Sequence, residues 1–231
     1  MTAPERATGA GRQSRGQKTR QAILDATLRV IADGGVRAVT HRAVAAEADV
    51  SLSLTTYHFS DIFDMVSSAF NDFVDRERPR VEQAWREVFD HVHRYSAAER
   101  RRRNIREQLR RRLTRIGVDY LLDKLQNHRA GIAVEHHFYF EALNDARLRA
   151  LYETSREPVL AEMTRFAALF NRQTPELDAE ILIGVILKME HKALIDPPDD
   201  IDRQYMELVL GRVIGWIMGL QHPPTEARAE P

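Results

Sequence analysis

The chain has 231 residues, and its 34 basic and 34 acidic side chains give a formal net charge of zero when histidine is neutral. Its hydrophobic content of 43% is typical of a globular protein with a packed core, and the absence of cysteine excludes disulfides, cysteine-based zinc sites and a thiol nucleophile. The apolar run Ile181 to Leu187 is far shorter than the roughly 20 residues of a membrane-spanning helix, and the N-terminus lacks the apolar segment of a secretory signal. We therefore expect a cytoplasmic protein that has no membrane partner.

Helical periodicity extends through most of the chain, which predicts an all-α fold. Residues 1–16, rich in Gly, Arg and Ser, are expected to form a disordered basic arm. A first helix is predicted over residues 17–33, ended by two glycines. Thr40 is a suitable N-cap for a short helix to residue 48. A turn at residues 49–51 then leads to a second short helix that ends near residue 58.

The remainder is predicted as longer helices. Pro79 is expected to separate a helix over residues 61–78 from one that ends near residue 93. Further helices are predicted at 97–127, 129–144, 147–170 with a kink near Pro158, 175–194 and 201–220. These elements predict an N-terminal domain at 17–62, a larger helical domain at 63–220 and a disordered tail at 221–231.

Basic residues are concentrated toward the N-terminal half. Residues 97–115 alone contain nine arginines and two glutamates, whereas residues 171–231 have a net charge of −5. An uneven charge distribution favours an anionic partner for the basic part. We expect the arginines at 100–103 to form a solvated face, with an anionic effector or partner as the alternative.

The two short helices at residues 40–58 are the most informative feature. A tight turn between two short helices is typical of a pair that presents its second helix to a partner. Val44 and Ala48 give the first helix a small apolar face, and Val50 fits the corner. The second helix offers hydroxyl and imidazole groups suited to the DNA major groove, and the alternative is a polar surface hairpin of helices. These groups belong to Ser53, Thr55, Thr56, Tyr57 and His58.

Residues 20–65 resemble the DNA-binding domain of TetR-family transcriptional regulators. The resemblance rests on Arg20, Ile23-Leu24, Ala26, Gly34-Gly35, Val39-Thr40, Val44-Ala45, Ala48-Asp49-Val50-Ser51 and Tyr57-His58-Phe59. Asp49 replaces the glycine usual at the turn, where a positive φ is often needed and Asp is tolerated. Ser53 replaces another glycine, and Ile62 replaces a lysine that contacts phosphate in the family.

The resemblance implies a role for each polar position. Thr40, Tyr57 and His58 are expected to bind phosphates, and Arg42 to bind either a phosphate or a base. Ser51, Leu52, Ser53 and Thr55 are expected to face base edges, with Leu52 able to contact a thymine methyl group. The predicted DNA-binding residues are therefore Thr40, Arg42, Ser51, Leu52, Ser53, Thr55, Thr56, Tyr57 and His58.

A second cluster combines histidine, glutamate and aromatic residues. His137 and Glu141 are one helical turn apart, a spacing that can bind a metal, but no third ligand is identifiable. We therefore expect no metal and no cofactor. The adjacent aromatic residues favour a cavity between helices, with plain core packing as the alternative. The predicted effector pocket consists of Trp85, Phe89, His137, Phe140 and Glu141.

The two C-terminal helices are apolar on all sides, so both faces must be covered. Gly211, Gly215 and Gly219 recur every four residues, with Gly184 on the neighbouring helix. Glycine destabilises a helix interior by roughly 1 kcal/mol relative to alanine, so this series indicates that another backbone approaches closely. We predict a homodimer interface at these four glycines. The alternative is that they pack inside one subunit.

Together these features predict a ligand-responsive transcriptional repressor that binds a palindromic operator as a dimer. Ligand binding would shift the population toward a conformer with low operator affinity. No feature indicates catalysis. The alternatives are a small helical metalloenzyme that uses Glu135, His136, His137 and Glu141, and a helical interaction module with no DNA-binding role.

Overall fold

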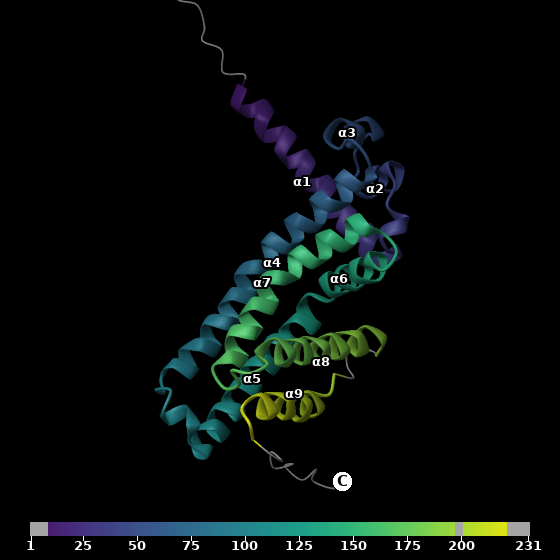
Figure 1. Cartoon of the computed structure of the whole chain (residues 1–231). Helices are drawn as coiled ribbons and strands as arrows, with labels where there is room; N and C mark the ends of the chain where they lie inside the picture. The colour runs from purple at the N-terminus through teal and green to yellow at the C-terminus, as the bar shows by residue number, and fades with distance from the viewer. Residues whose placement is uncertain (1–8, 197–200, 221–231) are drawn as a thin grey trace, which may run out of the picture. The chain divides into compact units, whose positions relative to one another are not determined.

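The computed structural model describes residues 9–196 and 201–220. In that part of the chain every regular element is helical, as predicted from the sequence (Figure 1). The elements are α1 (Gly9–Gly34), η1 (Val36–Ala38), α2 (His41–Glu47), α3 (Leu52–His58), α4 (Ile62–His93), η2 (Glu99–Arg101), α5 (Arg103–Asn127), α6 (Arg129–Ala142), α7 (Ala146–Ala168), α8 (Pro175–Ile195) and α9 (Arg203–Ile217). Over the same residues, no helix combines the length and the apolar character needed to span a bilayer.

The chain forms two compact units. The described residues of the first, called the N-terminal unit, are 9–76 and 133–152, and those of the second, called the C-terminal unit, are 77–132, 153–196 and 201–220. Helices α4, α6 and α7 contribute residues to both. The unit that contains the two short helices is therefore larger than residues 17–62, because the end of α6 and the start of α7 are part of it.

The N-terminal unit is built around aromatic and aliphatic side chains. Ile23 of α1, Val44 of α2 and Phe59 after α3 are buried together with Phe70 of α4. The ring of Phe70 stacks on that of Phe138 of α6 with their centroids 3.8 Å apart. Since α2 and α3 are only seven residues each, this shared core, rather than helix propensity, stabilises them.

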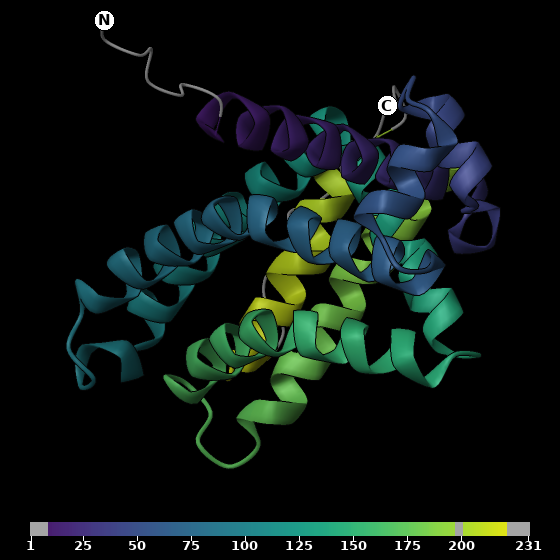
Figure 2. The same cartoon turned by 90° about the horizontal axis from the view of Figure 1, so that it is seen from above.

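The C-terminal unit has α9 packed against both α5 and α8. Figure 2 shows α9 in yellow alongside α8 in green. Its core includes Leu113 and Leu121 of α5 and Leu210 and Ile214 of α9. Within it, Lys124 Nζ lies 2.9 Å from Glu190 Oε1, and both side chains are buried.

Several helix boundaries differ from those predicted. Helix α1 begins at Gly9, so the predicted arm is partly helical, and residues 1–8 lie outside the described chain. Pro79 and Pro158 lie within the continuous helices α4 and α7. A proline removes one helical hydrogen bond at a cost of about 3 kcal/mol, and both helices nevertheless continue through it. Helix α5 begins at Arg103, after the separate turn η2. The predicted tail at 221–231 is outside the described residues.

Arginine side chains bind the carbonyl groups at or just after the ends of four helices. The last carbonyls of a helix have no partner within the helix, and a guanidinium placed there also interacts favourably with the helix dipole. These arginines satisfy carbonyls at the ends of α4, α9, α8 and α6. The pairs are Arg100 with Tyr95, Arg106 with Met218, Arg129 with Leu194 and Asp196, and Arg149 with Ala142 and Leu143.

Candidate DNA-binding interface

Helix α2 begins at the predicted cap. The backbone of Thr40 is extended, with φ −136° and ψ 155°, and its hydroxyl oxygen accepts a hydrogen bond of 3.0 Å from the backbone N–H of Ala43. This is the geometry by which Thr stabilises a helix N-terminus. The side chain is exposed, and its hydroxyl proton is still available for donation to another group, because in this bond the oxygen is only an acceptor.

The turn between α2 and α3 depends on Asp49. Its φ is 51°, and it is the only residue other than glycine with a positive φ in the described chain. The N–H of Val50 donates to the carbonyl of Ala45 at 3.0 Å, which is the bond that closes a helix followed by a left-handed residue. The prediction that this position needs a positive φ is confirmed, and Asp is among the few non-glycine residues that tolerate it.

Helices α2 and α3 and their N-caps expose most of the side chains predicted to bind DNA. Tyr57 is 80% exposed and Leu52 is 48% exposed, and His58 is half-buried. The hydroxyls of Ser51 and Ser53 lie 2.9 Å apart at the start of the helix. The predicted residues with exposed side chains are Thr40, Arg42, Ser51, Leu52, Ser53, Thr56 and Tyr57.

Thr55 does not face outward, and its predicted role in reading bases is wrong. Its side chain is completely buried, and its hydroxyl donates to the carbonyl of Leu52 at 2.8 Å. The same oxygen lies 3.0 Å from Nδ1 of His41. Since the single hydroxyl proton is used on Leu52, His41 Nδ1 must be the donor in the second bond. Thr55 and His41 therefore join α3 to α2.

His41 is a residue that sequence reasoning missed. It follows the cap Thr40 and resembles a surface residue of a short polar helix. The sequence offered one indication of its role, the spacing between His41 and Thr55. This spacing indicates a contact only when the geometry of the turn is known.

Helix α1 contacts both the end of α2 and the residue that follows α3. The guanidinium of Arg20 lies 5.2 Å from the centre of the Phe59 ring, and the side chain of Arg29 forms an ion pair with Glu47 at the end of α2. Gln21 of α1 donates to Asp72 of α4 at 2.9 Å. These contacts join α1 to the end of α2 and to Phe59 after α3, and α1 is in turn hydrogen-bonded to α4.

The residues predicted to form an effector pocket are divided between the two units. Trp85 and Phe89 pack in the C-terminal unit, where the two rings are 5.8 Å apart. Phe140 is 49% exposed. His137 and Glu141 instead belong to the N-terminal unit: an added Cβ on Gly35 would lie 3.1 Å from Nδ1 of His137.

The metal-binding alternative is not supported by this geometry. Glu141 forms an ion pair with Arg37, with Arg37 Nε and Glu141 Oε1 2.9 Å apart. Among the residues that the structure describes, no group of three or more His, Asp or Glu side chains has the arrangement of a metal site.

Two of the four glycines predicted at a dimer interface are instead interior. Gly211 and Gly215 are buried, and a Cβ on Gly211 would lie 3.2 Å from Arg110 and 3.3 Å from Thr114 of α5. The space beside Gly211 is thus filled by side chains of α5 of the same chain. Gly219 has φ 68° and terminates α9, whereas Gly184 is exposed with open space around it.

Comparisons with known proteins agree with this architecture. Residues 23–69 match the family model described as bacterial regulatory proteins, tetR family. No curated protein sequence matches the chain. A transcriptional regulator from Rhodococcus sp. Rha1 has a TM-score of 0.68 at 18% identity, with 87% of this chain and 96% of that one covered.

Two further solved structures have higher sequence identity. A member of the TetR family from Streptomyces coelicolor A3 is 28% identical, with a TM-score of 0.51 and coverage of 84% of this chain and 97% of that one. The multidrug binding protein EbrR, complexed with ethidium, is 28% identical, with a TM-score of 0.50 and the same coverage of both chains.

Proposed function

We propose that this chain, a TetR-family transcriptional regulator, is a repressor that binds a palindromic operator as a homodimer in the cytoplasm and releases it when a small molecule binds. The observation that carries this proposal is the exposed face of α3, held by a positive-φ turn and by the bond between His41 and Thr55. A short helix with exposed hydroxyl groups and one exposed tyrosine fits the major groove.

The DNA contacts divide into two kinds. Thr40, Arg42, Tyr57 and His58 lie at the edges of the helix pair and donate to phosphates. Ser51, Leu52, Ser53 and Thr56 point outward from α3 and face base edges. Phosphate contacts set the position of α3 in the groove, and base contacts choose the sequence.

The C-terminal helices support the homodimer. Leu177 and Ile181 of α8 are 55% and 51% exposed, and Trp216 of α9 is 58% exposed. Large apolar side chains on two neighbouring helices of one unit are typical of a surface that meets its own copy. Gly184, which has open space around it, lies one turn beyond Ile181 and permits close approach of a partner helix.

Release by a small molecule is supported by a neighbour. EbrR, to which the chain is 28% identical, is described as a multidrug binding protein and was solved with ethidium. The C-terminal unit of this chain also contains an aromatic cluster, with Trp85 5.8 Å from Phe89 and 6.2 Å from Phe166. A planar organic molecule is the effector class that such a cluster suits.

Selection of bound fragments from genomic DNA tests the proposal. The purified full chain should enrich a short site with two-fold symmetry, because two α3 helices of a dimer read successive major grooves. A variant with Tyr57 and Arg42 replaced by alanine should enrich nothing. Failure to enrich any site, or enrichment of a site without symmetry, would contradict the proposal.

Sedimentation of two matched variants tests the dimer. Ile181→Asp places a charge in the proposed interface and should give a folded monomer. Leu143→Asp introduces the same charge at another exposed apolar position, 59% exposed in the N-terminal unit, and should remain a dimer. A dimer in both cases would move the interface elsewhere.

A further inference from the structure

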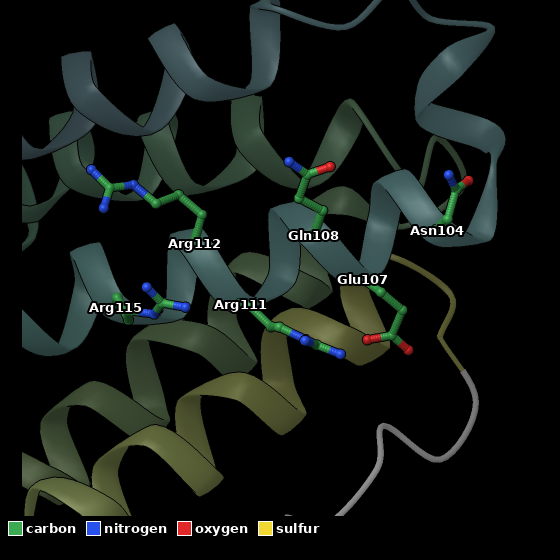
Figure 3. Close-up of a pocket in the computed structure, with 6 residues that line it drawn as sticks. All are labelled: Asn104, Glu107, Gln108, Arg111, Arg112 and Arg115. Atoms are coloured by element: carbon green, nitrogen blue, oxygen red, sulfur yellow. The ribbon is translucent and has the colours of Figure 1, made fainter.

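A groove runs along the exposed face of α5 in the C-terminal unit. It has a volume of about 500 Å³, and all of its lining residues come from three turns of that one helix (Figure 3). They are Asn104, Glu107, Gln108, Arg111, Arg112 and Arg115. None of the residues predicted to bind an effector is among them.

Four of the arginines in the first turns of α5 and just before it have partners within the folded chain. Arg100 and Arg106 donate to carbonyl groups at or after helix ends. Arg110 is buried, and its Nε lies 3.1 Å from Glu107 Oε2. Arg112 forms an ion pair of 3.0 Å with Glu87 of α4. These four side chains explain part of the arginine content of the segment through folding alone.

Arg111 and Arg115 have no such partner. Both are exposed, they are one helical turn apart, and neither forms a hydrogen bond or an ion pair with any described residue. Figure 3 shows them extending from the side of α5 opposite to Arg112. Like charges four residues apart on a helix repel each other, so these two guanidinium groups destabilise the free helix unless an anion lies between them.

The groove also offers many more donors than acceptors. Each guanidinium has five N–H groups and no acceptor, and the exposed amides of Asn104 and Gln108 add further N–H groups. The one carboxylate in the groove, Glu107, is engaged by Arg110. The remaining charge is that of two arginines, which bind phosphate or carboxylate oxygens in pairs.

We propose that the α5 groove is a binding site for a small, multiply charged oxyanion, with Arg111 and Arg115 as its main ligands. Two neighbouring guanidinium groups match the paired anionic groups of a diphosphate-bearing molecule. Asn104 and Gln108, which line the same groove, offer further N–H groups to the bound anion. This site is separate from α3 and does not depend on DNA binding.

Arg112 also lines the groove, and two partners on α4 hold its side chain. Its Nε donates to His91 Nε2 at 3.1 Å, which requires that nitrogen to be unprotonated. Burial, together with the neighbouring charges of Arg112 and Arg94, holds the pKa of His91 below its ordinary value of 6.5. This bond and the ion pair with Glu87 both direct Arg112 toward α4.

Titration calorimetry of the full chain with inorganic pyrophosphate tests the proposal. The wild-type chain should show saturable binding in low salt, weakened by added salt because the contacts are ionic. Arg111→Gln/Arg115→Gln should weaken it by about tenfold or more, the loss expected from removal of charged hydrogen bonds. Arg111→Lys/Arg115→Lys keeps the charge but loses the paired N–H geometry and should give an intermediate affinity.

Matched controls make the result decisive. Arg101→Gln/Arg102→Gln removes the same charge from exposed positions outside the groove and should bind pyrophosphate within about twofold of wild type. A parallel titration with succinate distinguishes a phosphate site from a general dianion site. Absence of wild-type binding, or equal weakening in the control pair, would overturn the proposal and show that the arginines form only a solvated face.

Discussion

Nδ1 of His41 lies 3.0 Å from the hydroxyl oxygen of Thr55, and this bond joins the two short helices of the candidate DNA-binding interface. The hydroxyl is completely buried and also donates to the carbonyl of Leu52. Thr55 thus completes a hydrogen-bonded chain from α2 to the first turn of α3. The orientation of the exposed residues on α3 depends on it.

Replacement of Thr55 should therefore affect folding first. Thr55→Val keeps the shape but leaves the His41 donor unsatisfied, which should lower the free energy of unfolding by about 1–3 kcal/mol. Ser53→Ala, at an exposed position two residues earlier, should change it by less than about 0.5 kcal/mol. Chemical denaturation of both variants measures the difference. Equal stability of the two would show that the buried bond contributes nothing.

Tyr57 and Ser53 should differ in how they affect DNA binding. Tyr57→Phe removes a phosphate donor and should weaken binding to a selected operator and to a scrambled duplex by the same factor. Ser53→Ala should instead relax the preference at one base pair, by about 1–3 kcal/mol if its contact is good. Binding titrations on both duplexes measure this. The assignment fails if Ser53→Ala weakens both duplexes equally.

Asp49 offers a test of the turn. Because its φ is 51°, Asp49→Gly should raise the thermal unfolding midpoint or leave it unchanged, whereas Asp49→Val should destabilise the chain by about 1–2 kcal/mol. Thermal unfolding followed by circular dichroism compares the two. If the valine variant melts with the wild type, the left-handed backbone at this position carries no cost.

The pair Lys124 and Glu190 should be sensitive to the loss of one member. Glu190→Gln removes the carboxylate partner of a buried ammonium group and should reduce stability by about 3–5 kcal/mol. The double replacement Lys124→Met/Glu190→Leu removes both charges and should recover most of that loss. Denaturant titration gives both values. A double variant as unstable as the single one would mean that packing, rather than charge, dominates this position.

Stability should fall on mild acidification through His91. The unfolded chain binds a proton near the ordinary pKa of 6.5, whereas burial and the nearby arginines lower the pKa of His91 in the folded chain. The unfolded state therefore binds more protons as pH drops below 6.5, and the free energy of unfolding decreases until the lowered pKa is passed. His91→Gln should reduce this slope. An unchanged slope in denaturation curves measured from pH 7.5 to pH 5 would rule out this contribution.

The parts of the site that depend on local backbone chemistry were predictable from the sequence. The cap at Thr40 and the positive φ at Asp49 follow from residue type and position alone. Burial of Thr55 was not predictable in this way, because a threonine on a seven-residue helix is equally suited to either face. Its direction is set by His41, on the other helix.

The effector pocket and the dimer interface were harder to predict from the sequence for a related reason. His137 and Trp85 could each line a cavity. The sequence does not reveal, however, that His137 of α6 belongs to the N-terminal unit and Trp85 of α4 to the C-terminal unit. The glycine series in α9 was interpreted as a place where another backbone approaches, whereas the neighbours of Gly211 are the side chains of Arg110 and Thr114 of α5. In both cases the spacing along the sequence indicates a contact but does not identify the element that makes it.

The arginines that bind carbonyl groups at the helix ends affect local unfolding of the chain. A helix end capped by its own flanking residues can fray independently of the rest of the molecule. Here the last carbonyls of α8 are held by Arg129 at the start of α6, and Met218 after α9 is held by Arg106 of α5. Loosening one terminus therefore exposes the guanidinium of a different helix, so local fluctuations are coupled between helices and unfolding becomes more cooperative.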